Sequence, residues 1–174
     1  MARLFEYQSK DLLRKQNIPV PAGRICQTPQ QVSDIALEIN KPVVIKAQTW
    51  FTGRASVGGI KFAETPEKAS EFAKEILGKT IRNFTVDEVL VEEKLSIKDE
   101  MFASITIDDL ARAPVLLFST KGGSGIEEIA KKYPDLIIEY PIDIYTGLRD
   151  FDSLNLLRKF DLDSKVMIQV SRLL

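Results

Sequence analysis

A lysine followed by a short glycine-containing loop is the segment of this chain best suited to binding phosphate. Lys46 comes directly after the apolar run 43–45, and Gly53 and Arg54 lie in the loop that follows. Glycine lets backbone amides approach phosphate oxygens, lysine supplies a compact positive charge, and arginine supplies a planar fork of donors. The segment 46–59 therefore suits a triphosphate, although it contains no Walker motif.

An ordinary surface turn is the competing interpretation of the same segment. Judged from its glycines alone, the loop around Gly53 is more simply a turn between two strands. Lys46 favours phosphate binding, because an unpaired ammonium at the edge of a core carries a large desolvation cost. We therefore expect Lys46 to have an anionic partner.

Acidic residues gather further along the chain. Glu92 and Glu93 end a predicted strand, and Glu100 follows eight residues after Glu92. A strand end followed by a short crossing segment suits a hinge between two lobes, where carboxylates can meet ribose hydroxyls or exocyclic amines. From the charge pattern alone, these acids are more simply solvated neighbours of Lys94 and Lys98.

The composition excludes several kinds of chemistry. The 174 residues include no histidine, which removes Ser-His and Cys-His catalytic pairs and histidine-ligated metals. Cys26 is the only cysteine, so it forms no internal disulfide, and we expect it to be a small core residue near the start of a strand. Reactive groups must therefore come from Lys, Arg, Asp, Glu and the backbone.

Charge and hydropathy also limit the partners. The net charge of −1, from 24 Lys and Arg against 25 Asp and Glu, argues against a broad basic surface for nucleic acid or for a membrane. No stretch is apolar enough to span a bilayer, and Glu6 and Lys10 interrupt the region where a signal peptide would be apolar. We expect a cytoplasmic protein with no nucleic-acid or membrane partner.

Helices are predicted from apolar residues at helical spacing. The first covers 4–13, and the next two begin at Thr28 and Thr65, where a hydroxyl cap is followed by proline. Two more helices are predicted at 126–132 and around 154–160, and the apolar segment 166–174 has no cap or stop after it. We therefore expect the chain to be cut inside an element at its carboxyl end.

Strands are predicted from short β-branched runs and from alternation at a spacing of two. The predicted strands are 43–45, 58–62, 88–92, 101–108, 115–118 and 136–138. A turn at 109–112 favours an antiparallel hairpin, whereas the earlier part of the chain alternates strands with helices. The expected fold is α/β with mixed sheets.

Several motifs, taken together and in order, carry a likeness to a known family. They are Phe5-Glu6-Tyr7-Gln8-Ser9-Lys10, Val44-Ile45-Lys46-Ala47-Gln48, Gly53-Arg54 with Gly58-Gly59-Ile60-Lys61, Leu90-Val91-Glu92, and Gly122-Gly123 with 126–130 and 134–137. Over essentially the whole chain, the sequence resembles the amino-terminal ATP-grasp region of succinyl-CoA synthetase (succinate-CoA ligase) β subunits. The same family includes ATP-citrate lyase, citryl-CoA synthetase and malate-CoA ligase subunits.

The resemblance implies an ATP-grasp fold in which two α/β lobes clamp a nucleotide. The small nucleotide-binding lobe would span 22–101, while 1–21 and 102–174 would form an incomplete part of the second lobe, whose carboxyl-terminal part is truncated. The nucleotide-binding residues that it implies are Lys46 on the phosphates, the backbone of Gly53, Arg54 and Ala55 over them, Glu92 and the backbone of Leu95 at the base, and Glu100 toward the ribose.

The implied activity forms succinyl-CoA from succinate, CoA and ATP or GTP. In this family the nucleotide phosphorylates a histidine of a partner α subunit, which also carries the CoA site, and the histidine-free composition here fits that division. Mg²⁺ is implied as well, with its ligands expected beyond Leu174, so we expect the chain to be inactive by itself.

Three alternatives stay open. A citrate-CoA or malate-CoA ligase β subunit would share the same nucleotide site. A non-catalytic nucleotide-binding assembly subunit would fit Thr52 and Ala55, which stand where the family usually has glycine. A ligase that joins a carboxylate to an amine would share the clamp without needing a histidine-bearing partner.

Overall fold

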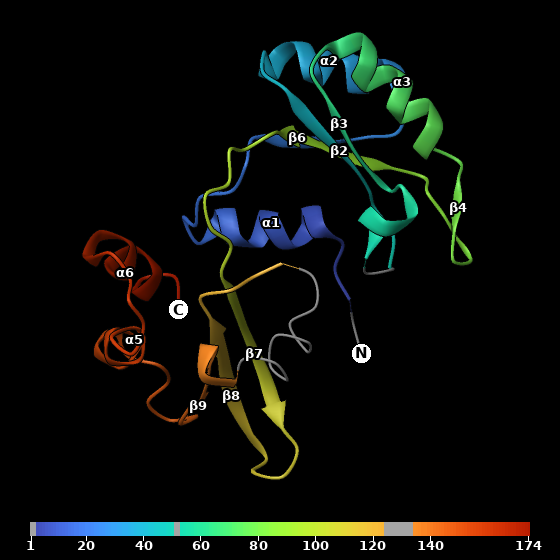
Figure 1. The fold of residues 1–174 in the computed structure, drawn as a ribbon. Coiled ribbons are helices and arrows are strands. Elements are labelled where there is room, and N and C mark those ends of the chain that lie inside the picture. Colours follow the sequence, from blue (N-terminus) through green and yellow to red (C-terminus); the bar gives the residue numbers. More distant parts are fainter. Residues whose placement is uncertain (1–2, 51–52, 124–133) are drawn as a thin grey trace. The chain divides into compact units, whose positions relative to one another are not determined.

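The computed structural model describes residues 3–50, 53–123 and 134–174 (Figure 1). Its contacts divide the chain into two compact units, Met1–Ser96 and Ile97–Leu174. The predicted small lobe ends at residue 101, close to this division, but residues 1–21 group with the first unit, whereas the sequence analysis placed them in the second lobe. The assignment of these parts to ATP-grasp lobes stays a prediction.

The first unit contains a four-stranded sheet in the order β1-β6-β2-β3. Its strands are β1 (Gly23–Cys26), β2 (Val43–Ala47), β3 (Ile60–Ala63) and β6 (Val89–Glu93). Helices α2 (Pro29–Ile39) and α3 (Pro66–Ile76) cover one face, and α1 (Glu6–Lys15) lies on the other face (Figure 1). The remaining elements are the 3-10 turn η1 (Arg54–Val57) and a small hairpin of β4 (Thr80–Ile81) and β5 (Phe84–Thr85), which the sequence analysis missed.

The predicted helix starts at the two threonines are confirmed. Thr28 accepts a hydrogen bond from the backbone N–H of Gln31, whose side chain accepts one from the Thr28 N–H in return. Thr65 caps α3 by accepting from the Lys68 N–H. These caps stabilise the first turn of each helix. The apolar faces of the two helices pack onto the sheet and form the core of the first unit.

The second unit contains a three-stranded sheet in the order β7-β8-β9. Its elements are β7 (Phe102–Asp108), β8 (Ala113–Ser119), η2 (Pro134–Leu136), β9 (Ile137–Pro141), α5 (Asp150–Leu157) and α6 (Ser164–Ser171). The predicted hairpin is confirmed, since β7 pairs with β8 from Phe102 opposite Ser119 to Asp108 opposite Ala113. The helix predicted at 126–132 lies outside the described residues, and the apolar segment 166–174 contributes to α6.

The α/β class is confirmed, but the mixed pairing is not observed: within the described ranges every strand pair of the sheets is antiparallel. The reason lies in the position of β6. It is the last of the four strands of the first sheet in sequence, yet it inserts between β1 and β2 and runs antiparallel to both. The crossover through α2 therefore leaves β1 and β2 separated by another strand.

Cys26 is a buried core residue as expected, although it ends β1 and does not begin a strand. Burial raises the pKa of its thiol to about 11, so the thiol stays protonated at neutral pH.

Among the helices that the structure describes, none has the length and apolar character needed to cross a bilayer.

Candidate functional site

Strand alternation sends an acidic and a basic side chain to the sheet face opposite α2 and α3. Ile45 and Val91 belong to the helix-covered core, so Lys46 and Glu92, each one residue further along, point to the other face. The register pairs Lys46 with Leu90, which places Glu92 at the diagonal position on the neighbouring strand. The two charges therefore meet across β2 and β6.

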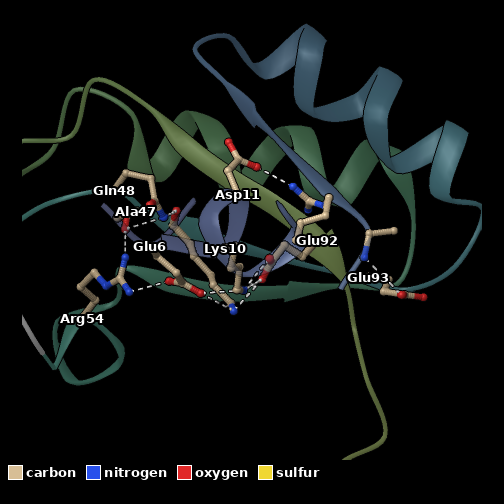
Figure 2. A network of polar contacts seen from close by, with 11 residues as sticks. Glu6, Lys10, Asp11, Ala47, Gln48, Arg54, Glu92 and Glu93 are labelled. Carbon is tan, nitrogen blue, oxygen red and sulfur yellow. Dashed lines mark hydrogen bonds and ion pairs between the residues drawn. The ribbon is translucent and has the colours of Figure 1, made fainter. Parts of the chain in front are cut away.

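Five charged side chains gather on this face, and we call Glu6, Lys10, Lys46, Arg54 and Glu92 the ion-pair cluster. The Lys46 Nζ donates to Glu92 Oε2 at 2.8 Å and to Glu6 Oε1 at 2.9 Å. The Lys10 Nζ donates to both Glu92 oxygens, at 2.5 and 2.6 Å, and to Glu6 Oε1 at 2.9 Å. Arg54 donates to Glu6 Oε2 at 2.6 Å, and Figure 2 shows Glu6, Lys10, Arg54 and Glu92 pointing toward one another.

Burial makes this cluster electrostatically strong. Only 2% of the Glu92 side chain is exposed, and Lys46 and Glu6 expose about a fifth of theirs, 21% and 22%. Burial alone would raise the pKa of Glu6, but hydrogen bonds and charges from Lys10 and Lys46 outweigh it and hold the pKa at about 2. Burial would likewise lower the pKa of Lys46, yet Glu92 and Glu6 raise it above its ordinary value. Glu6 and Lys46 are therefore both charged at neutral pH.

Helix α1 supplies two members of the cluster from one face. Glu6 and Lys10 are four residues apart and form an ion pair along the helix. The start of α1 is held by the Phe5 N–H, which donates to the Gln8 side chain at 2.9 Å. The Phe5 ring also stacks on Trp50, with ring centroids 4.1 Å apart. The first turn of α1 is thus fixed beside the loop that follows β2.

The loop after β2 shapes a cleft beside the cluster. Gly53 has a φ of +78°, which glycine adopts without strain, and η1 begins at the next residue. Arg54 donates to the backbone oxygen of Ala47 at 2.6 Å, which anchors its guanidinium. A cleft of about 730 Å³ lies here, lined among others by Glu6, Trp50, Gly53 and Arg54. Its wall therefore combines a charged end with an aromatic surface.

The structure brings together some of the predicted site residues. Lys46, Arg54 and Glu92 join the ion-pair cluster, and Gly53 lines the adjoining cleft. The other three are exposed: Ala55 follows Arg54 on η1, and Leu95, after β6, is 51% exposed. Glu100 belongs to the second unit, where its backbone oxygen accepts from the Gly122 N–H at 2.7 Å.

The structure corrects the interpretation of Glu92 as a solvated neighbour of Lys94 and Lys98. Glu92 is buried and accepts hydrogen bonds from Lys10 and Lys46, because alternation in β6 turns it toward α1. Glu93 is turned the other way and forms an ion pair with the exposed Lys41 at 2.8 Å.

The sequence did not indicate that Glu6 and Lys10 would join the ion-pair cluster. It did predict an anionic partner for Lys46, and that prediction is confirmed with two protein carboxylates, Glu6 and Glu92. The available signal was the spacing of four residues between Glu6 and Lys10, which places opposite charges on one helix face. No local feature of the sequence indicates which strand the charged face of α1 contacts.

The donor set fits a phosphate group. Lys10, Lys46 and Arg54 all donate to the Glu6 carboxylate, so their donors converge on one point where an anion is held. The donors that converge on Glu6 therefore suit an anion.

A magnesium site was also sought among the acidic side chains. Within 3–50, 53–123 and 134–174, no group of three or more His, Cys, Asp and Glu side chains is arranged to hold a metal ion.

Gly23 leaves the space into which Glu92 packs, and its replacement gives a testable prediction. A Cβ at Gly23 would clash with the Val91 backbone oxygen and lie 2.6 Å from the Glu92 Cγ, so β1 or Glu92 must shift. We expect Gly23→Ala to lower the free energy of unfolding by about 1–3 kcal/mol, as overpacking does. Urea unfolding followed by tryptophan emission measures this, and a change within about 0.5 kcal/mol, typical of a neutral surface substitution, would contradict it.

Comparison with known proteins now defines the class. The family model described as "ATP-grasp domain" matches residues 3–174, and the chain therefore belongs to the ATP-grasp family. A solved structure with the same fold is the dinucleotide-forming acetyl-coenzyme A synthetase 1 of Ca. Korarchaeum cryptofilum, with a TM-score of 0.73 and 18% identity, over 98% of this chain and 79% of that one. At this identity the likeness concerns the fold alone.

The curated relatives are more specific. The chain is 39% identical over 163 residues to the GDP-forming succinate-CoA ligase subunit beta of Thermus thermophilus, covering 94% of this chain and 43% of that one. It is 43% identical over 154 residues to the ADP-forming subunit beta of Chloroflexus aurantiacus, covering 88% and 40%. The resemblance described from the motifs is thus confirmed, and the chain spans less than half the length of these relatives.

Proposed function

We propose that this chain is the nucleotide-binding part of an acid-CoA ligase β subunit, which forms succinyl-CoA from succinate, CoA and ATP or GTP. Its similarity to two β subunits named as succinate-CoA ligases, at 39% and 43% identity, favours succinate over citrate or malate. The observation that carries the proposal is geometric. Lys46 and Arg54 donate to one carboxylate, as two cations around a phosphate oxygen would.

Each site residue has a role in this proposal. Lys46 and Arg54 bind phosphate oxygens through charge-assisted hydrogen bonds. Backbone amides from Gly53 to Ala55 lie over the phosphates, because glycine with a positive φ exposes them. Glu92 contributes at the base, as the resemblance implies, and it also holds the Lys46 ammonium in position across the sheet.

The remaining parts of the proposal follow the family. Leu95 contributes its backbone at the base and Glu100 faces the ribose. Mg²⁺ supplies charge neutralisation in reactions of this type, with ligands outside the described residues. The partner is an α subunit that carries the phosphorylated histidine and the CoA site, and the protein acts in the cytoplasm.

Nucleotide titration of the full chain tests this proposal. We expect wild-type protein to bind ADP or GDP in isothermal titration calorimetry. Lys46→Met is expected to weaken binding at least about tenfold, since a hydrogen bond to a charged group contributes about 1.5–3 kcal/mol. Lys41→Met is the matched control, because Lys41 is an exposed lysine near β2 that pairs with Glu93.

Two outcomes would count against the proposal. Wild-type protein that binds neither ADP nor GDP, with or without Mg²⁺, would contradict nucleotide binding itself. Binding that survives Lys46→Met unchanged would remove Lys46 from the phosphate site. Co-purification with a histidine-bearing α subunit separates this proposal from a ligase that joins a carboxylate to an amine.

A further inference from the structure

The Glu6 carboxylate occupies the point where the donors of the proposed phosphate site converge. Its Oε1 accepts from the Lys46 Nζ at 2.9 Å. Its Oε2 accepts from the Arg54 guanidinium at 2.6 Å, a contact drawn in Figure 2. Both cations therefore already hold an anion that belongs to the protein. Glu6 comes from α1, whereas Lys46 lies 40 residues further along the chain.

Glu6 is also accessible from the side where a ligand would enter. Its side chain is 22% exposed, and it lines the same cleft of about 730 Å³ as Gly53 and Arg54. A phosphate approaching Arg54 through this cleft would meet the carboxylate at contact distance. Two anions at such a distance repel each other strongly in a partly buried site.

We propose that Glu6 is an internal competitor of the nucleotide, so that polyphosphate binding requires Lys46 and Arg54 to exchange the Glu6 carboxylate for phosphate oxygens. The inference rests on the proposed function, which it extends by a contact that opposes ligand binding. Lys10 makes the exchange feasible. It pairs with Glu6 on the same helix at 2.9 Å, so the released carboxylate keeps a cationic partner.

Tryptophan fluorescence can report this exchange of partners. Phe5, the residue before Glu6, stacks on Trp50 with ring centroids 4.1 Å apart. Trp50 is the only tryptophan of the chain. Movement of the first turn of α1 therefore changes the surroundings of a single fluorophore.

The test compares three forms of the full chain: wild type, Glu6→Gln and Asp11→Asn. Each is titrated with inorganic tripolyphosphate and with ADP by calorimetry. Glu6→Gln is expected to bind both ligands at least about tenfold more tightly than wild type, a difference of about 1.4 kcal/mol. Asp11→Asn removes the same charge from the same helix, but Asp11 pairs with Arg14, so its affinity should stay within about twofold of wild type.

Two further measurements support the comparison. Tripolyphosphate is expected to change Trp50 emission in wild-type protein as Phe5 moves. Glu6→Asp keeps the negative charge but shortens the side chain and withdraws it from Arg54, so it should also bind more tightly than wild type. This variant supplies the test if Glu6→Gln does not fold, as judged by circular dichroism.

The outcomes separate the inference from the proposed function. If wild type binds and neither Glu6 variant binds more tightly, the inference is wrong, and Glu6 instead orients the cations. If no variant binds either ligand, the proposed phosphate site itself fails and the inference falls with it.

Discussion

Replacing Glu92 by alanine is expected to lower the free energy of unfolding by about 3–5 kcal/mol, the usual effect of breaking a buried ion pair. The Glu92 side chain is 2% exposed, and both of its oxygens accept from the Lys10 Nζ. One of them also accepts from the Lys46 Nζ. Without this carboxylate, two ammonium groups in a largely buried place share only Glu6, and each loses hydrogen bonds that water replaces poorly.

The measurement is urea unfolding of the full chain followed by Trp50 emission, which reports the first unit because this tryptophan is the only one. Glu92→Gln keeps the shape of the side chain and should give an intermediate loss if the alanine variant does not fold. Glu93→Ala is the matched control, since Glu93 is the next residue of β6 and pairs with the exposed Lys41. The prediction is wrong if Glu92→Ala and Glu93→Ala shift the midpoint equally.

Lowering the pH is expected to reduce the free energy of unfolding of the first unit, because Glu6 becomes protonated. Hydrogen bonds and charges from Lys10 and Lys46 overcome the opposing effect of burial and depress the pKa of Glu6 from 4.5 to about 2. A depressed carboxyl pKa means that the stabilisation is fully present above pH 4.5 and is lost as pH falls through about 2. The shift corresponds to about 3 kcal/mol of unfolding free energy lost across this window.

Glu6→Gln isolates this contribution. Every other acidic group titrates in both proteins, so the difference between their unfolding free energies, measured at several pH values from 5 downward, reports Glu6 alone. Wild-type protein is expected to lose about 3 kcal/mol more than Glu6→Gln over that range. Equal losses in the two proteins would contradict the prediction. The raised pKa of Lys46 reflects part of the same ion pair, so it adds no separate contribution.

Local features of the fold followed from the sequence because their signals are short-range. Thr28 and Thr65 cap helices within three residues of themselves, and the turn at 109–112 joins two alternating strands directly. The described strands pair only in antiparallel fashion, unlike the predicted mixed sheets, because the position of β6 between β1 and β2 depends on contacts between segments far apart in the chain. The order in which strands and helices follow each other along the chain does not determine the order of the strands in the sheet.

The sequence by itself determined that Lys46 follows a buried run, that a charge there needs an anion, and that Gly53 and Arg54 stand in the next loop. Only the tertiary structure decided which anions these are. Glu6 and Glu92 lie 40 and 46 residues from Lys46, and they reach it because β6 lies beside β2 and α1 crosses the open face of the sheet. Ion pairs between distant segments depend on strand order and on helix placement, and the packing of the whole unit determines both.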